Sequence, residues 1–314
     1  MSAVEANVQS TQYADFWNDI LVPKFIKYKH ILVDGLTHHS EAIFPSLPVK
    51  EGDKVLDVGC GFGDTAIKLA RRVGQSGKVV GLDCCEAFLE YGRKDAASLG
   101  LRNVSFVNGD ALLYHFEPEY DFVFSRFGTM FFANPVAGLR NMRKALKPGG
   151  IMTHIVWRTR NDNPWLSMAK EVVLKFLPPP GEDALTCGPG PFSMADEAMV
   201  SKMMEIAGYR DITFKRVDAP VLVGKTVEDA VNFQLAIGPA GEVVQRGGRS
   251  GRSKARANRS CAGGGHQFSE ERCRRDRDEF VFLGYFRQES SLTRGCGGQL
   301  TRSLREAGVS GLCF

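Results

Sequence analysis

The stretch VLDVGCGFG at residues 55–63 decides how this sequence folds. It joins an apolar run typical of a buried β-strand to three glycines in the pattern G-x-G-x-G, and then to a helical pattern over residues 65–73. Glycine lets a chain turn sharply off a strand because it adopts positive φ angles at no steric cost. A strand, a glycine turn and a helix in this order predict the first unit of a parallel α/β sheet.

The same alternation continues along the chain. Further strands are predicted at residues 79–83, 104–107, 120–125 and 151–157, and two more within 211–223; helices are predicted at 11–45, 86–99, 135–146, 196–207 and 227–236. Strands that alternate with helices pack as a sheet covered on both faces. We therefore predict an α/β fold with a Rossmann-like, doubly wound sheet in three αβα layers, mostly parallel and with an antiparallel edge strand.

Prolines and changes in composition divide the chain. Residues 1–49 are predicted to form an N-terminal helical cap, and residues 50–245 the main domain. Within this domain, residues 158–195 interrupt the alternation and contain several Pro and Gly residues, which predicts a lid insertion over the ligand site.

Residues 246–314 differ from the rest of the chain. They hold 13 Arg and one Lys against seven acidic residues, and they are rich in Gly, Ser and Cys. Two interpretations are open: a basic, disordered tail that binds nucleic acid, or a reading-frame shift in a GC-rich gene. Under the second interpretation this segment has no selected function.

The overall composition is ordinary for a soluble globular protein. Apolar residues make up 43% and charged residues 24% of the chain, and no apolar run approaches the length of about 20 residues that spans a bilayer. The N-terminus lacks the pattern of a signal peptide, so we expect a cytoplasmic protein with reduced cysteines and no integral membrane segment. The eight cysteines show no zinc-ribbon spacing, which predicts no metal site. Outside the tail, 26 basic residues face 29 acidic ones, so no nucleic-acid partner is expected.

The glycine turn distinguishes between two kinds of cofactor. A dinucleotide-binding turn, G-x-G-x-x-G, would place its third glycine at position 64, which is Asp64 here. Asp57 lies two residues ahead of the first glycine, and an acid there suits a cationic ligand rather than a pyrophosphate. S-adenosylmethionine carries a sulfonium and an amino group. The turn therefore favours S-adenosylmethionine over a nicotinamide cofactor.

Polar residues follow the other predicted strands at the same edge of the sheet. Asp83 ends the second strand, where a carboxylate can accept hydrogen bonds from both ribose hydroxyls. Asp110 follows the third strand and suits the adenine amino group, with Ala111 beside the ring. Ser125 ends the fourth strand. This agreement among four strand ends predicts one ligand site.

Residues 50–157 resemble the class I S-adenosylmethionine-dependent methyltransferases of the ubiquinone and menaquinone biosynthesis type. The matching motifs are VLDVGCGFG at 55–63, VGLD at 80–83, GDA at 109–111, FSRFG at 124–128 and LKPGG at 146–150. The resemblance is weaker up to about residue 245 and then stops. It implies methyl transfer from S-adenosylmethionine to a small-molecule acceptor, with residues 127–132 facing that acceptor. The cofactor-binding residues expected are Asp57, Gly59, Cys60, Gly61, Gly63, Asp83, Cys84, Asp110, Ala111, Ser125 and Arg126.

The sequence does not indicate the acceptor, the oligomeric state or a definite catalytic base. His154 and His115 are candidates for a base by chemistry alone, although His154 lies within the fifth predicted strand, where alternation more simply makes it a packed polar core residue. Two other functions stay open: a nonenzymatic S-adenosylmethionine-binding regulator, and a nucleic-acid methyltransferase that uses the basic tail.

Overall fold

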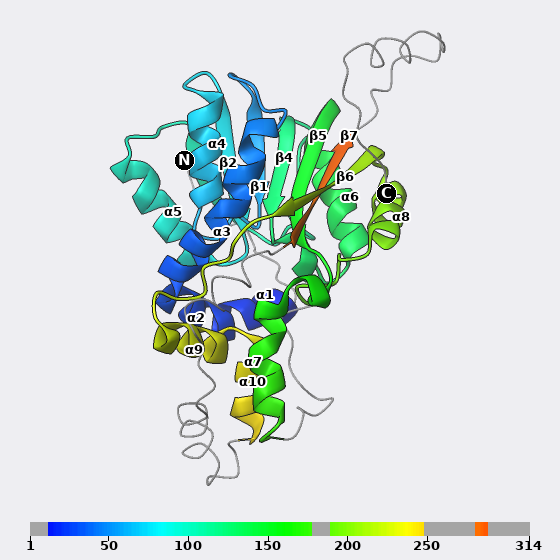
Figure 1. Ribbon diagram of the computed structural model, residues 1–314. Helices are drawn as coiled ribbons and strands as arrows, with labels where there is room; N and C mark the ends of the chain where they lie inside the picture. Colours follow the sequence, from blue (N-terminus) through cyan, green and yellow to red (C-terminus); the bar gives the residue numbers. More distant parts are fainter. Residues whose placement is uncertain (1–11, 178–188, 248–279, 288–314) are drawn as a thin grey trace.

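Figure 1 shows the computed structural model, which describes residues 12–177, 189–247 and 280–287. Its centre is a sheet of seven strands in the order β3-β2-β1-β4-β5-β7-β6. The strands are β1 (Lys54–Val58), β2 (Lys78–Asp83), β3 (Val104–Asn108), β4 (Tyr120–Arg126), β5 (Leu146–Trp157), β6 (Arg210–Asp218) and β7 (Phe280–Arg287). The first five strands pair in parallel, and β7 pairs antiparallel with both β5 and β6.

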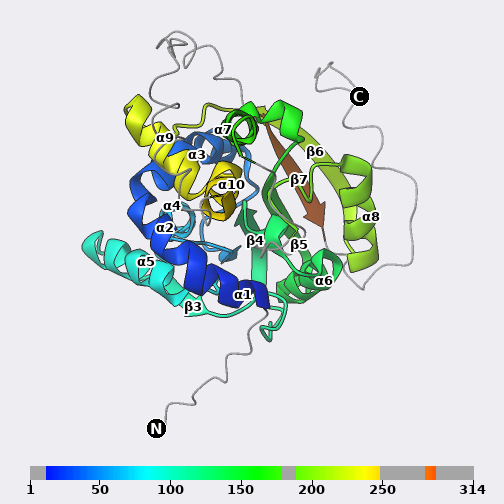
Figure 2. The same cartoon turned by 90° about the horizontal axis from the view of Figure 1, so that it is seen from below.

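Helices cover both faces of the sheet (Figures 1 and 2). On one side lie α3 (Lys29–Ile43), α4 (Asp64–Val73) and α5 (Glu86–Ser98), and on the other lie α6 (Pro135–Ala145) and α8 (Glu197–Ala207). Leu56 in β1 and Leu69 in α4 are almost fully buried between these layers, as are Phe122 in β4 and Leu139 in α6. Burying such apolar side chains on both faces stabilises the three-layer arrangement.

A second group of helices lies beyond the carboxyl ends of the parallel strands (Figure 1). It comprises α1 (Gln12–Phe16), the π-helical turn η1 (Trp17–Leu21), α2 (Val22–Lys27), α7 (Pro164–Leu174), α9 (Val227–Ala236) and α10 (Pro239–Gly247). Short 3₁₀ turns η2 (Phe44–Ser46), η3 (Thr129–Phe131) and η4 (Arg160–Asp162) link parts of the chain. No helix in the described ranges combines the length and the apolar character needed to cross a bilayer.

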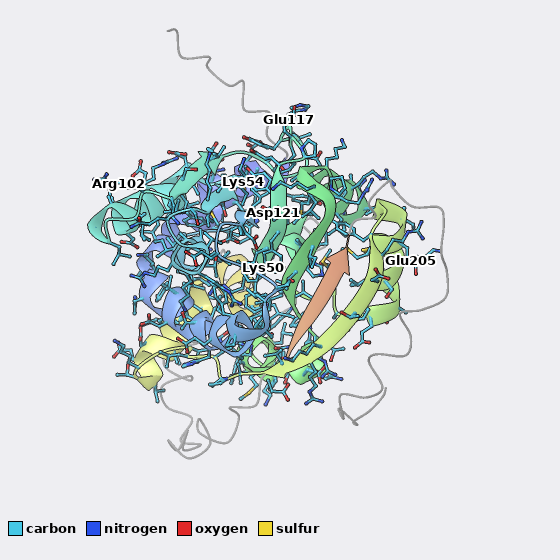
Figure 3. The ribbon with its side chains drawn as sticks, turned by 90° about the horizontal axis from the view of Figure 1, so that it is seen from above. Lys50, Lys54, Arg102, Glu117, Asp121 and Glu205 are labelled. Atoms are coloured by element: carbon cyan, nitrogen blue, oxygen red, sulfur yellow. The ribbon has the colours of Figure 1, made fainter. Side chains whose placement is uncertain are left out.

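The amino ends of the strands carry charged residues that pair with one another (Figure 3). The Lys54 N–H donates to Asp121 Oδ2 at 2.9 Å, and Lys147 Nζ donates to Asp121 Oδ1 at 2.6 Å. Partial burial raises the pKa of Asp121. The contacts with Lys147 and Lys54 lower this pKa by more than burial raises it, so it lies below the usual value. These contacts therefore join the starts of β1, β4 and β5.

The predicted fold class is confirmed, and so are the five parallel strands and the helices at 11–45, 196–207 and 227–236. Two details differ. The antiparallel strand lies one place inside the edge, because β7 inserts between β5 and β6. The prediction of two strands within 211–223 is wrong: a single strand, β6, ends at Asp218. Pro220 follows soon after and has no N–H to donate to a ladder.

The described part of segment 246–314 is the end of α10 and β7. β7, with the residues that this sequence gives it, forms part of the sheet. Its seven pairs with β5 run from Ile151–Arg287 to Trp157–Val281. The two interpretations of this segment, and the domain boundaries, stay predictions.

The chain that follows β6 crosses α3 at very close range. A Cβ at Gly35 in α3 would lie 2.5 Å from the carbonyl oxygen of Leu222, closer than real Cβ contacts come. The absence of a side chain at Gly35 therefore allows the segment that contains Leu222 to pack directly on the helix backbone.

The end of the N-terminal helices is fixed to α4 by one side chain. Arg72 donates to the carbonyl oxygens of Phe44, Leu47 and Val49, the last two at 2.8 Å and 3.2 Å. These carbonyls belong to the link between α3 and β1, which begins with the 3₁₀ turn η2. A guanidinium has five donors in a planar fork, so one arginine can satisfy all three acceptors.

We expect Arg72→Ala to lower the free energy of unfolding by about 2 kcal/mol, since hydrogen bonds from a charged donor are lost. Urea denaturation followed by circular dichroism measures this change. Arg71→Ala is the matched control, because Arg71 lies on the same helix and is exposed. Equal stability of the two variants would contradict the anchoring role of Arg72.

Candidate active site

The carboxyl ends of the parallel strands form one side of a cavity of about 1360 Å³. Gly59, Asp83, Asp110, Arg126 and Trp157 line it from strand ends or from the turns that follow them. The other side, which we call the far wall, comprises the cavity-lining residues of α1, η1, α2, η4, α7 and α9. Ligands of open α/β sheets bind at this edge, so the cavity is the candidate active site.

The glycine turn between β1 and α4 has a left-handed backbone. Gly59, Gly61 and Gly63 have φ angles of +67°, +52° and +82°. A Cβ at Gly59 would lie 3.1 Å from Cα of Gly128, and one at Gly63 would lie 2.6 Å from the Phe106 ring. A Cβ at Gly61 would meet no atom within 4 Å. Gly59 and Gly63 thus serve close packing, whereas Gly61 presents its backbone to open space.

Asp83 ties this turn to the end of β2. Its Oδ2 accepts the Gly61 N–H at 2.8 Å, and its Oδ1 accepts the Cys85 N–H at 2.9 Å. Burial raises the pKa of Asp83, and the hydrogen bonds from Cys85 and Gly61 act in the opposite direction. The carboxylate therefore faces the cavity in a fixed orientation, with its remaining lone pairs available for ligand donors.

Asp57 lies behind the cavity surface, because it is fully buried and is not among the lining residues. Thr65 Oγ1 donates to its Oδ2 at 2.6 Å, and its Oδ1 has no hydrogen-bond partner. Burial raises the pKa of Asp57 to about 7, against the lowering effects of the Thr65 hydrogen bond and of Arg126. An unpartnered buried carboxylate oxygen next to the glycine turn suits a nearby positive charge.

A buried ion pair joins β4 to the first residue of α4. Arg126 Nη2 donates to Asp64 Oδ1 at 2.8 Å, and Nη1 donates to Ser40 Oγ in α3 at 2.8 Å. The two charged side chains are 9% and 16% exposed, and both line the cavity. The sequence analysis assigned no contact to Asp64. Its position at a helix N-terminus was the available signal, since an acid is favoured there.

Asp110 and Ala111 lie in the turn after β3 and line the cavity. The Leu112 N–H donates to Asp110 Oδ1 at 2.9 Å. Asn141 in α6 donates its side-chain amide to the carbonyl oxygens of Ala111 and Tyr114 at 2.9 Å and 2.8 Å. This buried amide, which the sequence analysis missed, holds the turn in place.

The structure brings neither candidate histidine to the cavity. His154 is fully buried in β5, its Nδ1 lies 3.1 Å from Thr129 Oγ1, and burial lowers its pKa to about 4. His115 is exposed and pairs with Glu117 at 2.9 Å. Ser125 is also fully buried and does not line the cavity. Alternation within a strand that is buried on both faces does not indicate which residues face a ligand.

Three free cysteines, Cys60, Cys84 and Cys85, line the cavity near Asp83. The possible metal-binding atoms of Asp83, Cys84 and Cys85 lie within 4.8 Å of one another. Both oxygens of Asp83 accept N–H groups, and contact with Cys84 together with burial raises the pKa of the Cys85 thiol. A thiolate ligand is disfavoured under these conditions. The predicted lack of a metal stays a prediction.

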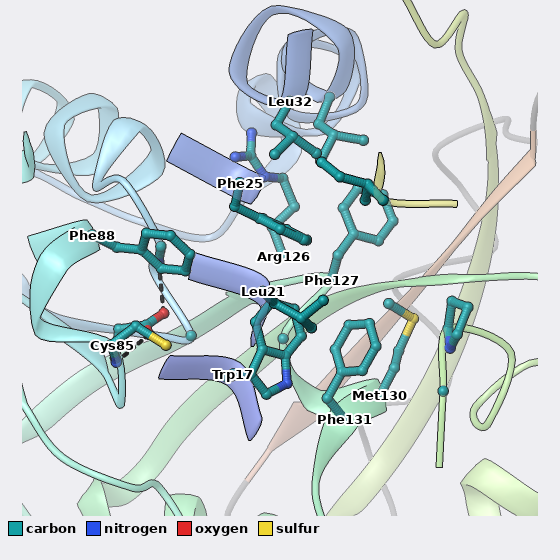
Figure 4. A pocket seen from close by; sticks show the side chains of 18 of the residues that line it. Trp17, Leu21, Phe25, Leu32, Cys85, Phe88, Arg126, Phe127, Met130 and Phe131 are labelled. Atoms are coloured by element: carbon teal, nitrogen blue, oxygen red, sulfur yellow. Dashed lines mark hydrogen bonds between the residues drawn. The ribbon is translucent and has the colours of Figure 1, made fainter. Parts of the chain in front are cut away.

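Aromatic rings form much of the cavity beyond the strand ends (Figure 4). The ring of Trp17 in η1 lies 5.1 Å from each of the Phe25 and Phe131 rings, edge to face in both cases. Phe127 stacks on Trp157 at 4.0 Å, with a backbone φ of +57° that is rare for a residue with a side chain. Residues 127, 128 and 130–132 all line the cavity.

Comparison with known proteins identifies the family. A family model described as a methyltransferase domain matches residues 49–177. A demethylmenaquinone methyltransferase of Staphylococcus carnosus is 30% identical over 182 residues, which cover 55% of this chain and 74% of the relative. The chain belongs to the class I S-adenosylmethionine-dependent methyltransferases. A demethylmenaquinone methyltransferase of Staphylococcus aureus is 39% identical over 111 residues, which cover 35% of this chain and 45% of that relative.

Solved structures share the fold. Phosphoethanolamine N-methyltransferase 2 of Haemonchus contortus, in complex with S-adenosyl-L-methionine, superposes with a TM-score of 0.54 at 15% identity and covers 90% of this chain and 61% of its own. The YcgJ protein of Bacillus subtilis has a TM-score of 0.51 at 15% identity, covering 81% and 100%. This methyltransferase uses S-adenosylmethionine and transfers its methyl group to a small-molecule acceptor.

The raised pKa of Asp57 predicts a pH dependence of stability. The native state holds a proton on Asp57 up to a pH of about 7, while the unfolded state releases it near pH 3.8. Between these values the native state binds more protons, so stability falls as pH rises. Asp57→Asn cannot ionise and can still accept the Thr65 hydroxyl.

We expect the wild type to lose about 2 kcal/mol relative to Asp57→Asn between pH 5 and pH 8. Urea denaturation of both proteins, without ligand, at the two pH values measures this difference. Asp53→Asn, at a half-buried aspartate near the start of β1, should follow the wild type, because an asparagine oxygen can still accept the Lys50 N–H. A constant difference between wild type and Asp57→Asn would refute the raised pKa.

Proposed function

We propose that the strand-end side of the cavity holds S-adenosylmethionine and that the far wall holds an apolar aromatic acceptor. The observation that carries this proposal is the continuity of the cavity, which joins the glycine turn and Asp83 to a cluster of aromatic rings. The named relatives are demethylmenaquinone methyltransferases, and their name includes that of a quinone. A planar ring system is the kind of ligand that edge-on and stacked aromatic side chains accommodate.

Asp83 is the proposed ribose ligand. Two N–H groups hold its carboxylate toward the cavity, and the two ribose hydroxyls are donors that match its remaining lone pairs. Asp110 and Ala111 would contact the adenine. Gly59, Cys60 and Gly61 would surround the methionine part, with Cys84 next to Asp83 and Arg126 beside the turn.

Asp57, Gly63 and Ser125 support the site from behind in this proposal, since none of them lines the cavity. Asp57 would contribute negative potential for the cationic part of the cofactor. Gly63 would allow α4 to begin close to Phe106, and Ser125 would pack beneath Gly128, whose Cβ would meet Ser125 Oγ at 3.1 Å.

The residues of this chain would act by positioning. S-adenosylmethionine supplies a methyl group that its sulfonium already activates. The protein aligns the acceptor in line with that bond and excludes water, which is a large part of such catalysis. Among the described lining residues, Asp64, Asp83 and Asp110 are the carboxylates, and histidine is absent from that lining. The described residues of the far wall thus offer no carboxylate or histidine as a base.

The N-terminal cap and the 158–195 segment would close the site. Trp17 and Phe25 from the cap, and Trp165 and Leu166 from α7, line the cavity on its far wall. Moving these helices would open it to solvent. The predicted cytoplasmic location and the role of segment 246–314 remain part of the proposal.

We expect Asp83→Asn to weaken S-adenosylhomocysteine binding about 10- to 100-fold, because the amide replaces a charged acceptor with a neutral group that holds two hydrogens. Isothermal titration calorimetry measures the Kd. Asp53→Asn is the matched control, at a half-buried aspartate that does not line the cavity, and should bind like the wild type. Unchanged affinity in Asp83→Asn would overturn the ribose assignment.

The acceptor can be found by mass spectrometry of cell extract incubated with the protein and methyl-deuterated S-adenosylmethionine. We expect a labelled, apolar aromatic small molecule. Label in nucleic acid would support the nucleic-acid methyltransferase alternative. Binding of S-adenosylhomocysteine with no labelled product would support the nonenzymatic alternative.

With that acceptor in hand, we expect Trp17→Ala to raise its KM about tenfold, since a buried aromatic contact is lost. The Kd for S-adenosylhomocysteine should stay within twofold of the wild-type value. Trp17→Phe should recover most of the loss. An equal loss of cofactor affinity in Trp17→Ala would show that Trp17 serves the cofactor side instead.

A further inference from the structure

The charges that line the cavity are separated by sign. The three lining carboxylates, Asp64, Asp83 and Asp110, lie at or just after the strand ends. The far wall carries Lys24 from α2, Arg160 from η4 and Lys170 from α7, and its described residues include no carboxylate. The cavity thus has an acidic side, where a cationic cofactor is proposed, and a basic side opposite.

The three cations of the far wall lack acidic partners. The fourth basic lining residue, Arg126, pairs with Asp64 at 2.8 Å. No carboxylate in the described ranges forms an ion pair with Lys24, Arg160 or Lys170. The guanidinium of Arg160 instead lies 5.6 Å above the ring of Phe192. Like charges around a partly apolar cavity repel each other more strongly than they would in bulk water.

Other polar groups of the far wall are also donors. The indole Nε1 of Trp165 is buried and has no hydrogen-bond partner. Lysine, arginine and tryptophan side chains are hydrogen-bond donors without an acceptor atom. Among the described residues of the far wall, only Tyr13 has a side-chain oxygen. A ligand that occupies this wall must therefore supply acceptors.

We propose that the methyl acceptor is an organic anion, with an apolar aromatic body and an acidic group that Lys24, Arg160 and Lys170 bind. This inference rests on the proposed function of the two sides of the cavity. The body would lie against Trp17 and Phe131, and the acidic group, a carboxylate or a phosphate, would neutralise the cations. An acceptor that binds as an anion also suits a far wall that offers no carboxylate or histidine as a base.

A matched pair of fluorescent dyes tests this proposal. 8-Anilinonaphthalene-1-sulfonate and N-phenyl-1-naphthylamine share one aromatic body, and the first alone carries an anionic group. Both are titrated into the full-length protein saturated with S-adenosylhomocysteine, so that the strand-end side is occupied. Binding of S-adenosylhomocysteine is measured before any dye is added. Absence of this binding would contradict the proposed function itself.

We expect the triple variant Lys24→Ala, Arg160→Ala, Lys170→Ala to bind the sulfonate about tenfold more weakly than the wild type, because three exposed ion pairs contribute modestly. The neutral dye should bind equally to both proteins. High salt should weaken sulfonate binding to the wild type and leave the triple variant unchanged. Trp17→Ala should weaken both dyes, which locates them in the cavity.

The charge-matched control is the triple variant Lys27→Ala, Lys175→Ala, Arg71→Ala, which removes exposed cations outside the cavity. It should bind both dyes like the wild type. Equal weakening of the sulfonate in the two triple variants would reduce the effect to net charge and overturn the proposal. So would unchanged sulfonate binding in the cavity variant, which would indicate a neutral acceptor.

Discussion

The hydrogen bonds between Asp83 and the N–H groups of Gly61 and Cys85 are the contact on which the site depends. They join the turn after β1 to the end of β2 through backbone donors, so their geometry is independent of side-chain rotamers at the turn. They require the left-handed backbone at Gly61, which glycine adopts without strain. They also stabilise a buried carboxylate that would otherwise favour its protonated form.

Much of the sheet could be predicted because its signals are local. The run at 55–63 and the strand ends at Asp83 and Asp110 are each readable within a few residues of sequence. The orientation of side chains in a strand that is buried on both faces cannot be read in this way. The sequence therefore does not show that Asp57, Ser125 and His154 lie away from the cavity. The ends of such a strand can be predicted from its apolar run, whereas the direction in which each side chain points depends on the elements packed against the strand.

The far wall and the Asp64–Arg126–Ser40 contacts lay beyond prediction for a different reason. They join segments 62 and 86 residues apart, and sequence patterns carry no information on which distant helices meet. The same holds for Asn141, which holds the turn at Ala111 and Tyr114 from another element. Long-range packing therefore forms the far wall, where we propose that the acceptor binds.

The close crossing of Gly35 and Leu222 has a consequence for the evolution of this enzyme. Leu222 and its neighbour Val221 line the cavity, and the backbone of Leu222 rests directly on α3 at Gly35. Any side chain at position 35 would push that stretch of chain away from the helix. The capacity of the cavity is thus set partly by the absent side chain of Gly35, a lining residue at which the chain of Leu222 meets α3. A single substitution at this lining position would reshape the cavity twice, through the new side chain and through the displaced backbone at Leu222.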